Sequence, residues 1–172
     1  MHIRRGTAED AAALAAFAAR TFAETFATDC TPEDMQAHLA QSYGVDRQGA
    51  ELTDPHVVTL LAEQDGRLVG YAQLRNAPPP VSVVAPDVHE LHRFYVDRPS
   101  QGAGVAQRLM AAVQDAAREA GARHLWLGVW EHNARALRFY AKCGFVDVGS
   151  HVFVLGGDRQ TDRVMLAPVP NQ

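Results

Sequence analysis

The sequence predicts an α/β fold in which a mixed β-sheet of about seven strands is flanked by helices on both faces. Segments of helical periodicity alternate with β-branched and leucine-rich segments along the 172 residues. Strands that follow one another indicate antiparallel pairing, whereas the strand–helix–strand unit around residues 88–129 indicates parallel strands. Because no internal repeat or low-complexity linker divides the chain, we expect residues 1–172 to form a single domain.

The first third of the chain predicts one short strand and two helices. Residues 1–6 indicate a strand that leads into a helix cap. Thr7 precedes acidic residues in a first turn, and apolar side chains then recur at helical spacing, so we expect a helix over residues 8–27. Thr31 and Pro32 are typical of the cap and first turn of a second helix.

The middle of the chain predicts three strands. The β-branched and leucine-rich runs over residues 56–62 and 68–74 flank a turn at residues 64–67, a pattern typical of a hairpin. The proline-rich residues 77–80 indicate a loop, because proline cannot donate a hydrogen bond inside a sheet. We expect the third strand over residues 88–96.

The last third begins with a glycine-rich turn and a long helix that should end at Gly121. The elements expected after it are a strand over residues 124–129, a helix over 133–142, and strands over about 146–155 and 162–166 that flank a turn at 156–158.

Composition excludes several classes of protein. The formal net charge is −4 and the charges are mixed, which argues against a partner that is a nucleic acid. The two cysteines, Cys30 and Cys143, can build neither a disulfide framework nor a zinc site. Nothing near the start resembles a signal peptide, and the alanine-rich residues 11–19 are too short to span a bilayer. We therefore expect a cytoplasmic protein without a membrane partner.

The turn before the long helix is a candidate for phosphate binding. It reads Gln101-Gly102-Ala103-Gly104-Val105-Ala106-Gln107. Glycines permit positive φ angles, and the N–H groups at the start of a helix suit a pyrophosphate. A short Gly-x-Gly also occurs in ordinary turns. A dinucleotide-binding fingerprint would need glycine at position 107, and a Walker-type loop would need Gly-Lys-Ser/Thr, which is absent.

Two motifs stand in a fixed order along the chain. The first is Arg93-Phe94-Tyr95-Val96-Asp97 followed by Gln101-x-x-Gly104-x-Ala106. The second, about thirty residues on, is Asn133-x-x-Ala136-x-x-x-Tyr140-x-x-x-Gly144-Phe145. Together they resemble the acetyl-CoA signatures of the GNAT acetyltransferase superfamily. Residues 127–133 and 160–162 are most similar to the Pai-type spermine/spermidine acetyltransferases.

The resemblance implies a fold, a co-substrate and a site. The sheet is expected to splay apart between the strand at 88–96 and the strand at 124–129, with acetyl-CoA in the gap. A backbone N–H near Val96 would polarise the thioester carbonyl. Ala103 stands where the superfamily often has Lys or Arg, for which Arg98 or Arg108 could compensate. The residues implied to bind acetyl-CoA are Phe94, Tyr95, Val96, Gln101, Gly102, Ala103, Gly104, Val105, Ala106, Gln107, Asn133, Ala136 and Tyr140.

Acetyl transfer to an amine requires a base for the amine and a proton for the departing thiolate. Tyr140 is the candidate for protonating the thiolate. Glu90, which aligns with an acidic position of the superfamily, His92 or water are the candidates for the base. Strand alternation predicts that even-numbered residues from 90 to 96 share one face. His89-Glu90-x-His92 lacks the two histidines four residues apart of a zinc-protease motif, so we expect no metal.

The acceptor follows less directly from the residues. The acidic side chains of Glu24, Asp29, Glu33 and Asp34 would suit a polycationic amine, although a solvated acidic surface explains each of them better. The resemblance favours a polyamine; peptide, protein N-terminal and small-drug acetylation stay open. Two other classes of function are a non-catalytic acetyl-CoA-binding regulatory module and, disfavoured by the glycine spacing, a dinucleotide-binding oxidoreductase. Homodimerisation is common in the superfamily, but nothing in the sequence demands it.

Overall fold

The computed structural model describes residues 1–26, 31–155 and 158–170. Within them seven strands form one mixed sheet in the order β1-β2-β3-β4-β5-β7-β6. The predicted end of the first helix at residue 27, Asp29, Cys30 and the turn glycines at 156–157 lie outside these ranges. The strands are β1 (His2–Arg5), β2 (Val57–Gln64), β3 (Arg67–Arg75), β4 (Val88–Val96), β5 (His124–Trp130), β6 (Val146–Leu155) and β7 (Asp158–Pro168).

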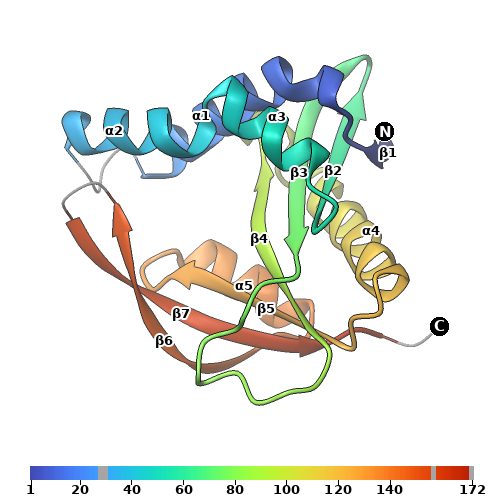
Figure 1. The fold of residues 1–172 in the computed structure, drawn as a ribbon, viewed down its shortest axis with the longest axis vertical. Coiled ribbons are helices and arrows are strands. Elements are labelled where there is room, and N and C mark those ends of the chain that lie inside the picture. The colour runs from blue at the N-terminus through green and yellow to red at the C-terminus, as the bar shows by residue number, and fades with distance from the viewer. Residues whose placement is uncertain (27–30, 156–157, 171–172) are drawn as a thin grey trace.

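Helices cover both faces of this sheet, as the sequence predicts (Figure 1). On one face, α1 packs Leu14, Phe17 and Phe22 against Leu61 and Tyr71 of the sheet. On the other face, the apolar stripe of α4 forms the larger core with β2 to β5, and side chains of α5 join it. The helices are α1 (Ala11–Phe26), α2 (Pro32–Tyr43), α3 (Val45–Thr53), α4 (Val105–Glu119) and α5 (Ala134–Lys142), with short 3₁₀ turns at Ala8–Asp10 and Arg98–Ser100.

The sheet opens between β4 and β5. These parallel strands pair only at their first residues, from Val88 opposite His124 to Glu90 opposite Trp126. Beyond these pairs β5 stays with β7, whereas β4 stays with β3. The strands therefore diverge, and Figure 1 shows β4 running up toward α1 while β5 turns away from it. The splay implied by the resemblance is thus present.

Three features differ from the elements that the sequence predicts. The first helix begins as the 3₁₀ turn Ala8–Asp10 before α1 starts at Ala11. The helix α3 was not predicted at all; its buried residues are Gln48 and Glu51, beside the half-buried Leu52, so its inward face is largely polar and its apolar periodicity is weak. The last strand is longer than expected, from Asp158 to Pro168.

A β-bulge in β4 also overturns the predicted alternation. Gln73 of β3 pairs with Arg93, but the next residue, Leu74, pairs with Leu91, so one residue of β4 is left over. As a result Leu91 and Phe94, three residues apart, both pack into the core beside α4. The even-numbered residues of β4 therefore do not share one face.

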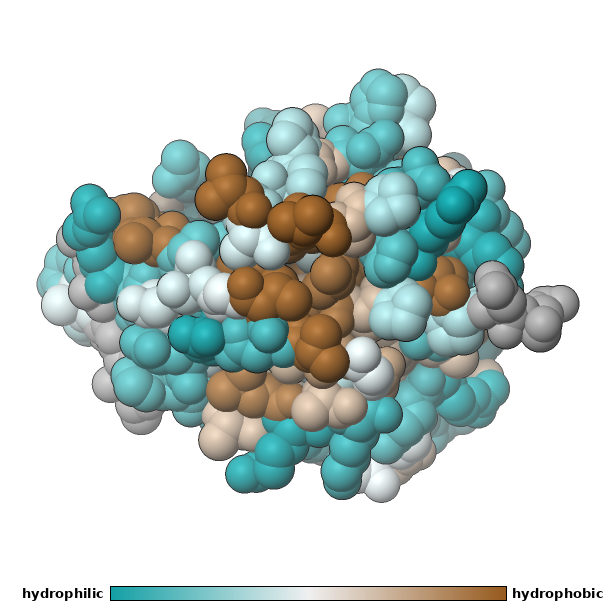
Figure 2. All heavy atoms as spheres, turned by 90° about the horizontal axis from the view of Figure 1, so that it is seen from below, coloured by the Kyte–Doolittle hydropathy of each residue, from teal (hydrophilic) through white to brown (hydrophobic). Residues whose placement is uncertain are grey.

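The face opposite α1 to α3 carries some exposed apolar side chains. Val81 and Val84 in the loop between β3 and β4 are 100% and 89% exposed, and Val146 at the start of β6 is 61% exposed. The loop lies at the bottom of Figure 1. Seen from below, hydrophobic groups gather in the middle of this face and hydrophilic groups surround them (Figure 2).

Candidate active site

Two adjoining cavities occupy the gap between β4 and β5. One, of about 300 Å³, lies beneath α1, α2 and α3; we call it the arginine-lined cavity, because Arg47, Arg75 and Arg93 line it. The other, of about 350 Å³, lies beside the glycine-rich turn; we call it the turn-side cavity. The cavities meet at side chains that line both of them, namely Thr25, Phe94, Tyr95, Asn133, Ala136 and Tyr140.

The turn-side cavity collects most of the residues expected to bind acetyl-CoA. Ala103, Gly104 and Val105 do not line it; Val105 is instead buried in the core beneath α4. The predicted residues that line it are Phe94, Tyr95, Val96, Gln101, Gly102, Ala106, Gln107, Asn133, Ala136 and Tyr140.

The turn itself has the backbone that an anion site needs. Gly102 and Gly104 have φ angles of +86° and +81°, a region that side chains with a Cβ rarely adopt. No atom lies within 4 Å of where a Cβ on either residue would stand, so a ligand can approach the backbone. α4 begins at Val105 without a side-chain cap, which leaves the N–H groups of its first turn open to an anion. The turn therefore fits a pyrophosphate.

Arginines add positive charge near this turn. Arg98 lines the turn-side cavity and donates to the carbonyl oxygen of Glu24 at 2.6 Å. Arg108, the other candidate from the sequence, donates instead to the carbonyl oxygen of Met1 and does not line the cavity. Arg135 also lines it; this residue was not predicted, because its only signal in the sequence is its place inside the second motif.

The end of β4 offers a backbone donor to the gap. The N–H of Asp97 donates to Val69 on β3, so the N–H of Val96, one residue earlier, points the opposite way, toward the gap. The carbonyl oxygen of Val96 accepts a hydrogen bond of 2.9 Å from Nε2 of Gln101. In turn Oε1 of Gln101 accepts a hydrogen bond from Arg135, which ties the turn to α5.

Tyr140 lies where the two cavities meet. It is 8% exposed and its ring packs against Phe94, Phe139 and Phe145, with ring centroids 5.5 to 6.2 Å apart. Burial raises the pKa of the Tyr140 hydroxyl above its ordinary value, and Cys143 contributes in the same direction. The hydroxyl therefore stays protonated at neutral pH and can act as a proton donor.

The start of α5 places the other two residues of the second motif. Oδ1 of Asn133 accepts a hydrogen bond of 3.1 Å from the N–H of Ala136 and so caps the helix. Asn133 and Ala136 line both cavities, as Tyr140 does. The shared face that the spacing predicts is therefore present, and the small Ala136 side chain leaves the passage between the cavities open.

The two candidates for the base are neighbours, but only one of them reaches a cavity. His92 lines the arginine-lined cavity, whereas Glu90 lines neither cavity. Nδ1 of His92 lies 3.3 Å from Oε1 of Glu90. The Glu90 carboxylate also accepts two hydrogen bonds from the Arg75 guanidinium. Glu90 thus stands behind His92, between it and Arg75.

The pKa values of this pair suit an imidazole base. Burial would raise the pKa of the Glu90 carboxyl, but hydrogen bonds from His92 and Arg75 outweigh it and hold the pKa below its ordinary value. Burial lowers the pKa of His92, although Glu90 opposes this effect. At neutral pH the carboxylate is therefore charged and the imidazole is neutral, so the imidazole can accept a proton.

The opposite wall of the arginine-lined cavity holds an acidic residue. Asp162 of β7 lines it and lies 3.7 Å from Nε2 of His151 on β6. Burial raises the pKa of the Asp162 carboxyl, and the nearby His151 opposes this effect. A Cβ on Gly128 would stand 3.1 Å from that imidazole nitrogen and 3.2 Å from the Asp162 carboxylate, so glycine gives this pair its room.

Neither a metal site nor a membrane-spanning helix is found among the described residues. In the parts of the chain that the structure describes, no group of three or more His, Cys, Asp or Glu side chains could hold a metal ion. Over the same residues, no helix combines the length and the apolar character needed to cross a membrane.

Known proteins resemble this chain in sequence and in fold. Residues 16–145 match the sequence model of the acetyltransferase (GNAT) family. An uncharacterised N-acetyltransferase of Lactobacillus delbrueckii subsp. lactis is 37% identical over 150 residues, which cover 87% of each chain. Another from Mycobacterium tuberculosis is 40% identical over 157 residues, which cover 91% of this chain and 96% of that protein.

A solved structure extends the likeness to the whole fold. The PaiA N-acetyltransferase of Thermoplasma acidophilum, in complex with coenzyme A, matches with a TM-score of 0.78 over 97% of this chain and 98% of that chain. Its identity is 20%, so it establishes the fold alone. The family model covers most of the chain, and the bacterial relatives cover nearly all of it. The chain therefore belongs to the GNAT acetyltransferase family and is an acetyl-CoA-dependent N-acetyltransferase.

Proposed function

We propose that the protein transfers the acetyl group of acetyl-CoA directly to a primary amine, with both substrates bound at once. One observation carries this proposal: two cavities meet at Tyr140, one beside an open glycine turn and the other beside a neutral imidazole. In this arrangement the turn-side cavity holds acetyl-CoA and the arginine-lined cavity holds the acceptor. Because the cavities share a boundary, the amine can reach the acetyl group without an acetylated form of the protein.

The chain's own groups then have distinct tasks. Acetyl-CoA, when bound, supplies a thioester carbonyl. The N–H groups at the start of α4, with Arg98 and Arg135, hold the pyrophosphate, and the N–H of Val96 stabilises negative charge that develops on the carbonyl oxygen. His92 accepts the proton that the amine loses, and Glu90 fixes the orientation of its ring. Tyr140 donates a proton to the departing sulfur.

The acceptor class expected from the sequence, a polyamine, has mainly the local resemblance as its support. Within the described residues, Glu24, Glu33 and Asp34 do not line the arginine-lined cavity. Glu24 instead lines the turn-side cavity, where it pairs with Arg20 at 3.2 Å. We therefore propose a primary amine without restricting it to polyamines. The cytoplasmic location and homodimerisation stay predictions.

Release of free thiol from acetyl-CoA tests the proposal. The reaction should be run with spermidine, with a peptide that has a free N-terminus, with a panel of small amines, and without amine. We expect release that depends on one of the amines and that falls strongly in His92→Gln. Measurable acetyl-CoA binding with no release for any amine would instead support a non-catalytic acetyl-CoA-binding module.

A further inference from the structure

The arginine-lined cavity presents more guanidinium groups than the proposed acetyl transfer uses. Three guanidinium groups line it, and Asp162 is the only carboxylate to do so among the described residues. Arg93 has a structural task, because its Nη1 donates to Glu51 and Gln73 and its Nη2 donates to the carbonyl oxygen of Ser42. Arg47 and Arg75 are not explained in this way.

Each of these two arginines donates to a carboxylate and, among the described residues, keeps N–H groups without a hydrogen-bond partner. Nε of Arg47 donates to Glu51 at 2.7 Å, and among the described residues its Nη1 and Nη2 have no hydrogen-bond partner. Arg75 donates through Nε and Nη2 to Glu90, and over the same residues its Nη1 has no partner. The arginine side chains are 55% and 36% exposed, whereas the Glu51 and Glu90 side chains are only 11% and 9% exposed. The carboxylates thus anchor the guanidinium groups and leave N–H groups available at the cavity.

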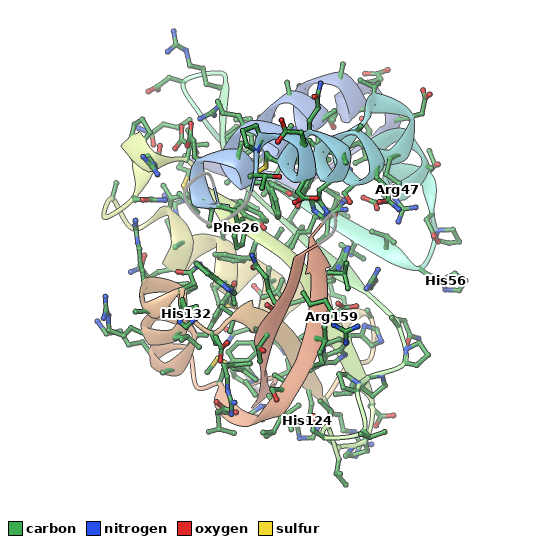
Figure 3. The ribbon with its side chains drawn as sticks, turned by 90° about the vertical axis from the view of Figure 1, so that its left-hand side faces the viewer. Phe26, Arg47, His56, His124, His132 and Arg159 are labelled. Atoms are coloured by element: carbon green, nitrogen blue, oxygen red, sulfur yellow. The ribbon has the colours of Figure 1, made fainter. Side chains whose placement is uncertain are left out.

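The other residues that line the cavity indicate what the rest of the acceptor molecule is like. Phe22 and Phe26 of α1 and Trp130 of β5 line the same cavity, so part of it is apolar. In the view of Figure 3, Phe26 and Arg47 lie on either side of the upper ends of β6 and β7. The cavity therefore offers aromatic surface together with arginine N–H donors, whereas the ammonium groups of a polycation would meet two guanidinium groups that cannot accept hydrogen bonds.

We infer that the acceptor carries an anionic group, a carboxylate or a phosphate, in addition to the amine that is acetylated, and that Arg47 and Arg75 bind this group. The inference rests on the proposed function, in which this cavity holds the acceptor. Arginine suits the task, since its planar N–H donors match the oxygens of a carboxylate or a phosphate. Because Arg75 and His92 share Glu90, the anion and the amine bind at neighbouring points. Amino acids and amine phosphates thus fit the cavity better than polyamines do.

Matched pairs of amines test the inference, because the members of each pair differ only in the anionic group. The pairs are phenylalanine with 2-phenylethylamine, 6-aminohexanoate with pentylamine, and O-phosphoethanolamine with ethanolamine; spermidine serves as the polycation. We expect kcat/KM to be at least about tenfold higher for the anionic member of at least one pair. The phenylalanine and phosphoethanolamine pairs distinguish a carboxylate from a phosphate.

A variant of Arg47 tests whether this residue causes the preference for the anionic amine. In Arg47→Gln, the ratio of kcat/KM between the two members of the preferred pair should fall by about tenfold. Arg67→Gln is the matched control, since Arg67 is an exposed residue at the start of β3 that lines neither cavity, and it should leave that ratio unchanged. The Arg47 side chain is more than half exposed, so the substitution should leave the protein folded, which circular dichroism can verify.

The results separate this inference from the function on which it rests. A higher kcat/KM for spermidine and for the neutral member of every pair would overturn the anionic acceptor while confirming amine acetylation. An anionic preference that Arg47→Gln leaves intact would overturn the role of the arginine. Thiol release with none of these amines would contradict the proposed function itself.

Discussion

Replacing Tyr140 by Phe tests the proton donor with the least possible change to the molecule. The substitution removes one oxygen and keeps the ring that packs against Phe94, Phe139 and Phe145. The free energy of unfolding should therefore change by no more than about 1 kcal/mol. A positioned general acid contributes a factor of about 10² to 10⁴. We expect kcat to fall by at least about 100-fold, which corresponds to about 2.7 kcal/mol.

The pH dependence of this loss is also fixed by the structure. Because burial raises the pKa of the Tyr140 hydroxyl, the wild-type group is protonated across the range from about pH 6 to about pH 9. The ratio of the wild-type and Tyr140→Phe rates should therefore be constant over that range. Thiol release measured with saturating amine gives kcat, and titration of acetyl-CoA gives its affinity.

A matched control and a clear outcome complete the test. Tyr71→Phe removes the hydroxyl of another buried tyrosine, whose side chain lines neither cavity, and should leave kcat within about twofold of wild type. If Tyr140→Phe keeps its kcat within about threefold, Tyr140 is not the proton donor. A loss confined to acetyl-CoA affinity would assign it to binding alone.

Three further substitutions probe the base, the buried network and the passage between the cavities. Glu90→Gln removes the interaction that raises the pKa of His92, so the acidic limb of the kcat/KM–pH profile should move to lower pH; an unmoved limb contradicts the pairing. Glu51→Ala leaves Arg93 buried without its carboxylate and should cost about 3 to 5 kcal/mol in urea unfolding. Because Glu51 has a pKa below its ordinary 4.5 in the folded state, this cost should shrink as the pH falls below 4.5, and a pH-independent cost argues against the ion pair. Ala136→Leu fills the boundary of both cavities and should raise KM for acetyl-CoA at least about tenfold in initial-rate assays; an unchanged KM places the thioester elsewhere.

Local signals predicted the turn and the helix starts beside the turn-side cavity, and the family resemblance implied which of their residues bind acetyl-CoA. The glycine turn, Asn133 and Tyr140 are each marked by residue type and by spacing within one strand–helix unit. A helix start and a helix face follow from such spacing without knowledge of distant contacts. The splay of β4 from β5 was different in kind, because pairing between strands is a property of the whole sheet. It was accessible through the family resemblance and not through periodicity.

One extra residue in β4 explains why strand alternation did not predict which candidate base lies at the cavity. A regular strand would have put Glu90 and Phe94 on one face, but the bulge opposite Gln73 and Leu74 shifts the register by one residue. The shift leaves His92 at the cavity and Glu90 behind it. Strand residues carry no local mark of a bulge when no glycine accompanies it, so the order of the two groups had to come from the structure.

Arg47, which lines the arginine-lined cavity, and Glu51, which binds it, both lie on α3, the one helix that was not predicted from the sequence. Hydrophobic periodicity detects helices that bury apolar side chains, whereas α3 buries Gln48 and Glu51. Glu51, one of the buried polar residues that make the apolar pattern of α3 weak, is also the carboxylate that binds Arg47 and Arg93. Without α3, the acceptor was judged mainly from the family resemblance, with the acidic residues of the first two helices beside it, and the prediction was a polyamine. The burial of Glu51 is offset by its ion pairs with Arg47 and Arg93, and Arg47 is one of the two residues that we propose bind the acceptor. A polar inward face on a short helix can therefore mark a candidate site.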